Sequence, residues 1–353
     1  MSAPVTLCIV NYNGERYLPR TLDAARRSAL AFDEIVLVDD ASPDRSVALV
    51  RECWPDVTVV RQETNGGPGA ARNAGYRAAR NDLILFIDND VALTPECAGR
   101  LRDALQQRPD AAVAMPRVLY ADRPEVIQYE GADCHYLGLM ALRHQDEPAA
   151  SAPDVVSDTR SVVTCAFLMD RARWGPATPF DPSFIFNYED HDFGVRTRVM
   201  GHAVLAVPAA TVLHGGGTEG LSFREGRERS PIRVYCLIRN RWRILLQSFE
   251  VRTLVLIAPA LAAYEAVQLA GAVKKGWLGI WLRAAGWIVG HPGTIVRRRR
   301  EVQRARRAAD RTLLVGGPLP FTPGLAAGGA ERAIRRALDR CVIGYWRLVR
   351  RAL

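Results

Sequence analysis

The sequence predicts an α/β protein whose central sheet is mostly parallel and covered by helices on both faces. Short apolar runs rich in β-branched residues alternate with helical patterns, and each run ends in a loop that carries Asn or Asp. Strands buried on both faces read as continuous apolar runs, and helices between them produce a parallel sheet. Ligands of such sheets bind beyond the carboxyl ends of the strands, so the polar loops are the candidate site.

The predicted elements follow in order along the chain. Four apolar runs near the N-terminus are expected to be strands: 5–10, 34–40, 57–60 and 83–88. Three helical patterns lie between them: 16–31, one that precedes residue 57, and 68–80. Farther along, the pattern is less regular and predicts a strand at 113–116, a polar excursion over 120–160 with a hairpin at 129–142, and a strand at 162–169.

Length and charge divide the chain into two parts. Its 353 residues exceed the usual size of one hydrophobic core, which predicts a large domain over 1–230 and a helical region over 231–353. Residues 250–353 hold 19 Lys and Arg against 6 Asp and Glu. The net charge of the whole chain is +9, so residues 1–249 carry −4. A basic tail predicts a polyanionic partner, either nucleic acid or an anionic membrane surface.

The cysteines and the N-terminus bear on the compartment. Seven cysteines are scattered through the chain without a C-x-x-C pair, which indicates reduced, mostly buried thiols. No basic stretch followed by an apolar one precedes the first strand at Val5, so we expect no cleavable signal. Both observations favour a cytoplasmic location for residues 1–249.

Asp88 and Asp90 follow the apolar strand that begins at Leu83 and are separated by one residue. Side chains at i and i+2 of an extended segment point the same way, so both carboxylates can converge on one highly charged ligand. A divalent metal that carries a phosphorylated ligand fits that requirement. The alternative is a polar turn after a strand, where Asp and Asn are common for conformational reasons.

A glycine-rich loop over 65–75 opens a predicted helix and contains Gly67 and Arg72. Backbone N–H groups at a helix N-terminus favour an anion, and glycine lets a ligand approach closely. The loop matches neither G-x-G-x-x-G nor the P-loop, so the alternative is a tight turn with a surface arginine.

Asp39 and Asp40 end the second predicted strand. In nucleotide-binding α/β folds, an acid at that position accepts hydrogen bonds from a ribose or a base. The alternative is capping of the next helix through Asp40, Ser42 or Asp44.

Three carboxylates, Glu189, Asp190 and Asp192, crowd into four positions flanked by Phe and Tyr. Crowding and apolar surroundings raise the pKa of a carboxyl group, which suits a general base. The alternative is an acidic helix start that interacts with the helix dipole. His214 stands alone at a strand end before a glycine loop. It gains a role only if Asp88 and Asp90 bind a metal that needs a third ligand.

The order of these segments resembles the family 2 inverting glycosyltransferases with the GT-A fold. The resemblance covers about 5–225 and is closest to the bacterial rhamnosyltransferase-like members that build cell-surface polysaccharides. The matching motifs are Val-Asn-Tyr-Asn at 10–13, Val-Asp-Asp at 38–40, Asn-x-Gly-x-Gly-x-x-Arg-Asn at 65–73, Asp-Asn-Asp at 88–90, Glu-Asp at 189–190 and His-x-Gly-Gly at 214–217.

The resemblance implies a nucleotide-diphosphate sugar donor, such as a UDP-, dTDP- or GDP-sugar. The residues that would hold this donor are Asn11, Asn13, Asp39, Asp40, Gly67, Arg72, Asn73 and Asp88. Asp88 and Asp90 would engage Mg²⁺ or Mn²⁺, and His214 would complete the metal shell.

The resemblance also implies that Asp190 deprotonates the acceptor and that Glu189 orients the acceptor or supports the base. Asp192 stays an alternative base. The middle residue of the Asp-Asn-Asp motif is Asn89 and not an acid, but both outer residues of the motif keep their carboxylates.

The basic tail predicts contact with a membrane. Residues 253–273 are apolar and about long enough to cross a bilayer, although Pro259 and Glu265 interrupt them. Residues 276–290 contain three Trp and are too short to span, and the basic run over 297–311 would meet anionic lipid. We expect two helices embedded in, or re-entering, the cytoplasmic leaflet. The alternatives are a soluble helical lid and the interface of a homo-oligomer. Interleaved apolar helices argue against nucleic acid.

These patterns favour an enzyme that moves a sugar from a nucleotide donor to a saccharide or lipid-linked saccharide acceptor at the inner face of the membrane. A polyprenyl diphosphate is the expected lipid. Two other functions fit parts of the pattern. A sugar-phosphate nucleotidyltransferase would use the metal but would not need Asp190 as a base. A non-catalytic membrane-bound protein would bind nucleotide sugars without turning them over.

Overall fold

The computed structural model describes residues 3–215, 230–320 and 329–353. These residues form two compact units. Of the described residues, the first unit comprises 3–132, 142–197 and 202–215, and the second 133–141, 198–201, 230–320 and 329–353. The second unit thus contains two short segments of the predicted 1–230 domain as well as the C-terminal region. The division at residue 230 stays a prediction about domain boundaries.

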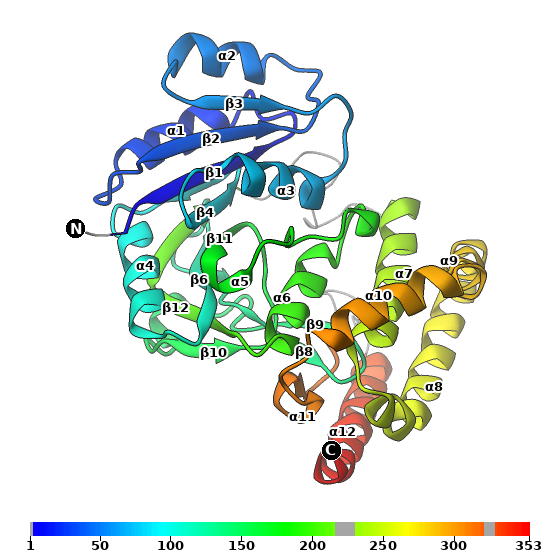
Figure 1. Cartoon of the computed structure of the whole chain (residues 1–353). Coiled ribbons are helices and arrows are strands. Elements are labelled where there is room, and N and C mark those ends of the chain that lie inside the picture. The colour runs from blue at the N-terminus through cyan, green and yellow to red at the C-terminus, as the bar shows by residue number, and fades with distance from the viewer. Residues whose placement is uncertain (1–2, 216–229, 321–328) are drawn as a thin grey trace. The chain divides into compact units, whose positions relative to one another are not determined.

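A ten-stranded sheet forms the centre of the first unit, in the order β10-β12-β6-β11-β4-β1-β2-β3, with β5 beside β12 and β7 beside β6. Its strands are β1 Val5–Asn11, β2 Glu34–Asp39, β3 Thr58–Arg61, β4 Leu83–Asp88, β5 Val91–Leu93, β6 Ala111–Tyr120, β7 Ile127–Tyr129, β10 Ser157–Thr159, β11 Ala166–Asp170 and β12 Ala203–His214. β1 to β4 are mutually parallel (Figure 1), so the first four predicted strands are confirmed. Their carboxyl ends, at Asn11, Asp39 and Asp88, share one edge of the sheet.

Helices lie on both faces of this sheet, as predicted. They are α1 Leu18–Arg26, α2 Ser46–Cys53, α3 Pro68–Ala78, α4 Cys97–Gln107, α5 Arg171–Trp174 and α6 Glu189–Val199, with 3₁₀ turns η1 Ala149–Ser151 and η2 Pro182–Phe184. α1 ends earlier than the predicted residue 31, because the N–H of Ala29 bonds to the carbonyl of Pro95 at 2.8 Å instead of continuing the helix.

Alternation along β1 explains the two layers. Leu7 and Ile9 belong to the core that includes Leu22 of α1, whereas Cys8 faces the opposite layer. There α3 approaches so closely that a Cβ added to Gly75 would lie 2.2 Å from the Cys8 sulfur. Glycine is therefore required where α3 crosses β1, and this contact fixes the helix that follows the glycine-rich loop.

The second half of the sheet is more antiparallel. β11 pairs antiparallel with both β4 and β6, and β5 pairs antiparallel with β12. That last pairing sets His214 opposite Val91 and therefore next to Asp90. β6 extends well beyond the predicted 113–116 because it pairs with β12 over most of its length.

An aromatic cluster supports the start of α6. Phe86 of β4 stacks on Phe167 of β11 with ring centroids 5.0 Å apart. Phe193 of α6 lies 5.6 Å from Phe167 and 4.8 Å from Phe180. Aromatic pairs at these separations add to the burial they provide. The cluster therefore holds the acidic start of α6 against the strand that ends in Asp88.

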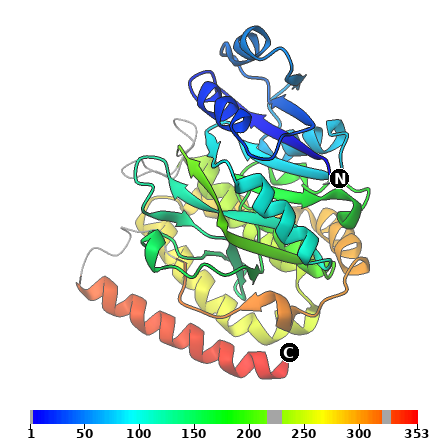
Figure 2. The same ribbon diagram turned by 90° about the vertical axis from the view of Figure 1, so that its left-hand side faces the viewer.

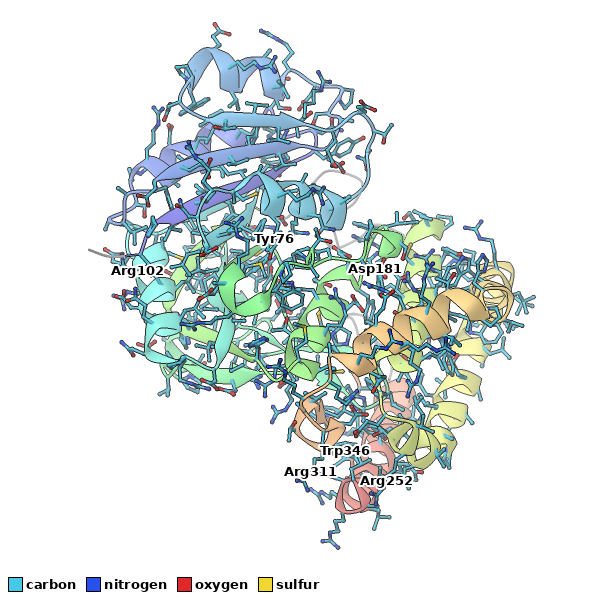
Figure 3. The ribbon with its side chains drawn as sticks, in the orientation of Figure 1. Tyr76, Arg102, Asp181, Arg252, Arg311 and Trp346 are labelled. Carbon is cyan, nitrogen blue, oxygen red and sulfur yellow. The ribbon has the colours of Figure 1, made fainter. Side chains whose placement is uncertain are left out.

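The described part of the second unit contains a three-stranded sheet, in the order β13-β8-β9, together with helices α7 to α12 (Figures 1 and 2). The elements are β8 Ala132–His135, β9 Met140–Leu142, β13 Leu314–Val315, α7 Pro231–Ser248, α8 Val251–Lys274, α9 Leu278–Gly290, α10 Pro292–Arg304, α11 Asp310–Leu313 and α12 Gly329–Ala352. The ring of Tyr136 stacks on that of Trp346, labelled in Figure 3, at 4.9 Å, and its hydroxyl donates to the Val342 carbonyl at 3.0 Å. These contacts attach α12 to the β8–β9 hairpin.

Candidate active site

A buried hydrogen-bond network joins the ends of β1, β2 and β4. The Asn11 amide donates to the Asp39 carboxylate at 2.8 Å, and the Asn89 amide donates to the Asn11 side-chain oxygen at 2.9 Å. Asn11 and Asp39 are fully buried, and the Ser42 N–H also donates to Asp39, at 3.1 Å. Asn89 donates a second bond to the Tyr12 carbonyl at 3.2 Å. The middle residue of the Asp-Asn-Asp motif therefore braces the strand ends, a role that the sequence did not indicate.

Asn13 lies in the loop after β1 with a positive φ of 53°. Its N–H donates to the Ser42 hydroxyl at 3.0 Å. Its side-chain oxygen is buried and accepts no hydrogen bond from the residues that the structure describes. This acceptor suits a donor group on a bound ligand.

Asp40 shapes the glycine-rich loop. Its carboxylate accepts the N–H groups of Gly66 and Gly67, both at 2.9 Å, and burial raises its pKa. Two N–H groups that we expected to face an anion are thus used within the protein. Helix capping falls instead to Asp44, which accepts the N–H of Ser46 at 3.1 Å near the start of α2.

Gly67 is required by the backbone on which it packs. Its φ is +81°, and an added Cβ would lie 2.3 Å from the carbonyl oxygen of Ile185. Ile185, Asn187 and Tyr188 also have positive φ, between 58° and 66°. Such conformations are strained for residues other than glycine and often occur at functional sites. The glycine-rich loop therefore touches the strained segment that leads into α6.

Arg72 lies between the two acidic groups rather than on the surface. One of its terminal nitrogens, Nη2, is 2.6 Å from Asp88 Oδ1 and donates to the Thr164 carbonyl at 3.0 Å. The other, Nη1, lies 4.0 Å from Glu189 Oε1. Arg72 is almost fully buried, and its Nε and Nη1 make no hydrogen bond within the described part of the chain.

Asn73 has a mainly structural environment. Its amide donates to the Phe180 carbonyl at 2.8 Å and accepts the Phe180 N–H at 3.0 Å. Both ends of the side chain are thereby engaged with the segment before α6. The expected contact between Asn73 and the nucleotide stays a prediction.

Asp90 and His214 meet as the pairing of β5 with β12 requires. His214 Nε2 lies 3.3 Å from Asp90 Oδ1, and its Nδ1 lies 2.6 Å from Oε1 of Gln128 on β7. Asp88 does not join them, because its carboxylate is paired with Arg72. Among the described residues, no group of three or more His, Cys, Asp or Glu is arranged to hold a metal. The glycines at 216 and 217 lie outside the described residues.

Asp88 nevertheless interacts electrostatically with Asp90 and His214 as well as with Arg72. Burial raises its pKa, Arg72 and His214 lower it, and Asp90 raises it. The side chain is 32% exposed, whereas that of Asp90 is 3% exposed. Asp88 is therefore the carboxylate of this pair that solvent or a ligand can reach.

Glu189 and Asp190 begin α6 in surroundings that oppose ionisation. Burial raises the pKa of Glu189 to about 8, with a further increase from Asp190. Burial also raises the pKa of Asp190 to about 6, although the His191 N–H, which donates to its carboxylate at 2.7 Å, acts in the opposite direction. Near neutral pH, Asp190 is thus mostly ionised and Glu189 mostly protonated.

Asp192 is poorly placed to act as the alternative base. It is 1% exposed, and its carboxylate accepts a hydrogen bond from Arg196 Nε at 2.7 Å. The i, i+4 spacing of these residues places the pair on one side of α6, facing the protein.

His191 follows the acidic pair in α6, and its ring is turned into the protein. It is fully buried, and burial lowers its pKa to about 3, so the ring is neutral. Its Nδ1 lies 2.6 Å from the Ser161 hydroxyl, a second residue that the sequence gave no reason to select.

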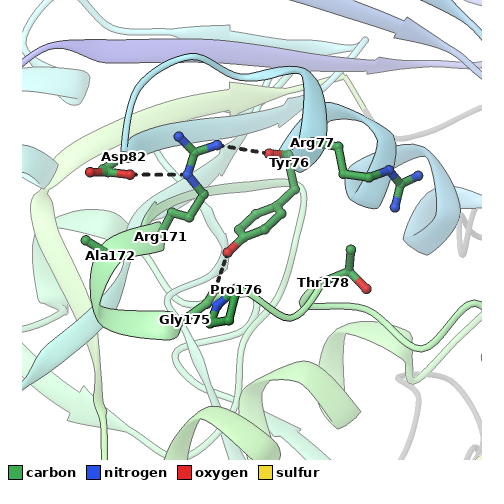
Figure 4. A pocket seen from close by; sticks show the side chains of 8 residues that line it. All are labelled: Tyr76, Arg77, Asp82, Arg171, Ala172, Gly175, Pro176 and Thr178. Carbon is green, nitrogen blue, oxygen red and sulfur yellow. Dashed lines mark hydrogen bonds and ion pairs between the residues drawn. The ribbon is translucent and has the colours of Figure 1, made fainter.

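A pocket of about 520 Å³ lies elsewhere in the first unit, at the C-terminal end of α3 (Figure 4). Its wall includes Arg171, which donates to the carbonyls of Tyr76 and Ala79 at 3.2 and 2.8 Å and pairs with Asp82. A cation at the end of a helix satisfies carbonyls that lack intrahelical partners. The pocket is thus explained by helix capping and contains none of the predicted site residues.

Comparison with known proteins agrees with this geometry. The family described as glycosyl transferase family 2 matches residues 6–154. Residues 6–154 thus match a family 2 glycosyltransferase domain. Among curated relatives, the succinoglycan biosynthesis protein ExoO of Rhizobium meliloti is 36% identical over 128 residues, which cover 36% of this chain and 35% of ExoO. An uncharacterized glycosyltransferase of Haemophilus influenzae is 31% identical over 30% of this chain and 36% of its own length. The chain thus spans about a third of these relatives.

Solved structures support the GT-A fold of the glycosyltransferase domain. TarS 1–349 of S. aureus aligns with a TM-score of 0.52 at 17% identity and covers 98% of this chain and 91% of its own. GalNAc-T7, solved with UDP, GalNAc and Mn²⁺, aligns with a TM-score of 0.57 at 18% identity, over 74% of this chain and 51% of its own. At these identities the likeness concerns the fold alone.

Proposed function

We propose that the glycosyltransferase domain transfers a sugar from a nucleotide-diphosphate sugar to a saccharide or polyprenyl-diphosphate-linked acceptor in cell-surface polysaccharide synthesis, with inversion of the anomeric centre. The main support is the position of Arg72. Its guanidinium bonds to Asp88, at the proposed donor end, and lies 4.0 Å from Glu189, at the proposed acceptor end. Inverting transfer needs both acidic groups near one reacting centre, and Arg72 brings them together.

Asp90 and His214 lie together at the donor end, and Asp88, which pairs with Arg72 in this structure, would have to turn toward them to complete a site for a divalent cation. Asp88 and Asp90 offer carboxylate oxygens and His214 an imidazole nitrogen, a set that suits Mn²⁺ or Mg²⁺. When bound, the cation would stabilise the negative charge that appears on the departing diphosphate. The buried, unbonded Nε and Nη1 of Arg72 suit additional anionic oxygens from the donor. Because solved structures of this fold contain UDP with Mn²⁺, and UDP-GlcNAc, a UDP-sugar is the first donor to test.

Asp190 is the proposed base. Near pH 7 its carboxylate is mostly ionised and can accept the proton of the attacking hydroxyl. Glu189, protonated at the same pH, can donate a hydrogen bond that orients the acceptor or Asp190. The strained segment with Ile185 precedes both acids and packs against the donor-side loop at Gly67.

The stereochemistry of the product tests this proposal. A thermal-shift screen of nucleotide sugars with Mn²⁺ selects the donor, since a bound ligand raises the melting temperature. Transfer from that donor to a saccharide acceptor should give a product with the opposite anomeric configuration, which the anomeric proton coupling constant in NMR reports. A product that retains the donor configuration would contradict a single displacement with Asp190 as the base.

The second unit supports a membrane-associated acceptor. α8 is, in the described part of the chain, the one helix long and apolar enough to cross a membrane. Its exposed residues between Arg252 and Lys274 are all Ala, Val, Pro or Gly, which gives an apolar face about 33 Å long with a cation at each end (Figure 3 labels Arg252). The other face of α8 carries Glu265, whose carboxylate pairs with Arg241 of α7.

This asymmetry favours a helix that lies along the membrane surface. A spanning helix would need lipid-compatible neighbours, but α8 is joined to α12 through a hydrogen bond from the Tyr345 hydroxyl to the Leu256 carbonyl at 2.6 Å. α12 exposes arginines at 340, 347 and 350. Charged helices of this kind remain at the interface. We therefore infer a peripheral or monotopic protein.

Only part of the basic run after residue 296 is available to contact anionic lipid. Arg297, Arg300 and Arg304 line a pocket of about 370 Å³ on α10, which suits an anionic headgroup. In contrast, Arg299 turns inward and donates to the carbonyls of Leu246 and Phe249, both at 2.7 Å. The expectation that the whole run meets lipid was therefore too broad, because helix α7 also needs cations at its C-terminal end.

We infer the cytoplasmic face of the inner or plasma membrane, where a nucleotide donor and a lipid-linked acceptor can meet. The cysteines support this location: none of the seven forms a disulfide, and five of them are buried.

The apolar face of α8 gives a direct test of membrane binding. The double variant Val255→Glu/Val267→Glu places two charges on the exposed face and should reduce co-sedimentation with phosphatidylglycerol vesicles by at least about tenfold. Val155→Glu is the matched control, because Val155 is 70% exposed in the first unit and Val255 is 68% exposed. Equal sedimentation of the double variant and the wild type would contradict this surface.

A further inference from the structure

We propose that Arg61 is a specificity residue that recognises the base of the nucleotide donor, through hydrogen bonds from its guanidinium to carbonyl oxygens of the base. This inference rests on the nucleotide donor of the proposed function and involves no metal ligand. Arg61 is the last residue of β3, the strand at one edge of the ten-stranded sheet (Figure 1). It lies beside Asp39 of β2 in the parallel register, at the carboxyl edge where a ligand of such a sheet binds.

The two acids next to Arg61 are already engaged within the protein. Asp39 is fully buried, and its carboxylate accepts hydrogen bonds from the Asn11 amide at 2.8 Å and the Ser42 N–H at 3.1 Å. Asp40 is 3% exposed and accepts two N–H groups of the glycine-rich loop. A base could reach either carboxylate only by displacing these bonds, and buried hydrogen bonds to a charged group are costly to lose.

The guanidinium of Arg61 lies on the outer side of this buried network. Its Nε is 3.5 Å from Asp39 Oδ2, and its Nη2 donates to the Ser42 carbonyl at 3.2 Å. The side chain is nevertheless 56% exposed, and its Nη1 makes no hydrogen bond within the described part of the chain. Two contacts therefore hold the guanidinium in place while donors stay available. A guanidinium has five N–H donors in a rigid plane and no acceptor, so it binds planar groups that carry acceptors.

The width of the sheet fits a nucleotide between Asp88 and Arg61. The strand order at this edge is β4, β1, β2, β3, and Asp88, Asp39 and Arg61 end the first, third and fourth of these strands. Neighbouring strands lie about 4.8 Å apart, so three steps separate Asp88 from Arg61 by about 14 Å. In a nucleoside diphosphate, the ribose and one phosphate separate the base from the terminal phosphate, a span of this order. A donor with its diphosphate at Asp88 thus brings its base to β3.

The donors of Arg61 select bases that present carbonyl oxygens. Uracil and thymine carry two such oxygens, and guanine presents O6 together with N7, a pair that arginine binds in a bidentate manner. Adenine has no carbonyl oxygen and places an amino group, itself a donor, where guanine has O6. We therefore expect at least one of UDP, dTDP and GDP to bind about tenfold or more tightly than ADP.

Thio-substituted nucleotides test the contact without any change to the protein. 2-Thio-UDP and 4-thio-UDP each replace one carbonyl oxygen of uracil with sulfur, which is a weak acceptor. In isothermal titration calorimetry with the full chain, one of the two should bind about tenfold more weakly than UDP. The corresponding thio analogues of dTDP or GDP take their place if one of those nucleotides binds most tightly.

Arg61→Ala and a matched control separate base recognition from structural support. Arg61→Ala should weaken binding of the preferred nucleotide by about 10–100-fold and reduce the difference between that nucleotide and its thio analogues to less than about twofold. Arg80→Ala is the control, because Arg80 is 74% exposed and pairs with a buried acid, Glu34, at 2.8 Å. Glu34 begins β2 and Asp39 ends it, so the two ion pairs are alike but lie at opposite ends of one strand. Arg80→Ala should change nucleotide affinity by less than about twofold.

The inference is overturned if the wild type binds the preferred nucleotide and its thio analogues equally, if ADP binds as tightly, or if Arg61→Ala retains the difference. A loss of affinity that Arg80→Ala matches would also overturn it, because Arg61 would then act through stability alone. A wild-type protein that binds none of UDP, dTDP, GDP and ADP would instead contradict the nucleotide donor of the proposed function, and the role of Arg61 would fall with it.

Discussion

Asp190→Asn should lower kcat by about 10²–10⁴-fold, the range that general base catalysis contributes. The amide keeps the shape of the side chain but cannot accept the proton of the acceptor hydroxyl at neutral pH. The wild-type rate should also fall as pH decreases through about 6, because burial raises the pKa of Asp190 to about 6 and only the ionised form acts as a base. Initial rates across pH 5–8 should show this acidic limb in the wild type and its loss in Asp190→Asn.

Two neighbouring acids provide controls for that result. Glu189→Gln should reduce the rate less and retain the acidic limb, because the amide can still donate a hydrogen bond. Asp192→Asn removes the charge that pairs with Arg196, so it should lower the melting temperature and leave the limb in place. If Asp190→Asn retains full turnover, the chain performs a different reaction, and a nucleotidyl transfer becomes the better explanation.

Asp90→Ala should reduce metal-dependent turnover by about 1,000-fold, which corresponds to about 4 kcal/mol of transition-state stabilisation. The substitution removes the carboxylate that His214 contacts at 3.3 Å and one oxygen of the proposed cation site. Initial rates over a range of Mn²⁺ concentrations, with and without EDTA, measure the effect. Excess Mn²⁺ should restore little of the lost rate, since the ligand and not the ion is missing.

Asp82→Ala is a suitable control for the loss of a carboxylate. Asp82 is 65% exposed and pairs with Arg171 at the far end of α3, so its removal should change turnover by less than about twofold. Wild-type activity that survives EDTA would remove the metal from the mechanism, and the Asp88, Asp90 and His214 group would then need another role.

The first four strands and their ends could be predicted because local signals and tertiary structure agree there. Each strand is a continuous apolar run, and a parallel sheet places all its carboxyl ends on one edge, so Asn11, Asp39 and Asp88 were brought together without knowledge of any contact. Gly67 was also singled out from the sequence, as part of a donor-binding loop, and its contact with a donor stays a prediction. In the structure, its N–H binds Asp40 and its Cα packs on Ile185.

Other parts of the site depend on contacts that no local pattern encodes. Whether Asp190 or Asp192 is available follows from which side of α6 faces the protein, and that depends on Arg196 and the aromatic cluster. Gln128 lies in a polar stretch without periodicity, and only the pairing of β7 with β6 brings it to His214. Such residues become visible only when the order of the strands is known.

Arg72 has a consequence for the evolution of this chain. A buried donor without an acceptor costs about 1–3 kcal/mol, and Arg72 holds two such nitrogens in place before any substrate arrives. In the proposed reaction this would be electrostatic preorganisation: the fold would tolerate a local penalty so that no rearrangement is needed during the reaction. Loss of the guanidinium would end that penalty but would also leave Asp88 without its ion pair, so few substitutions of Arg72 can be tolerated.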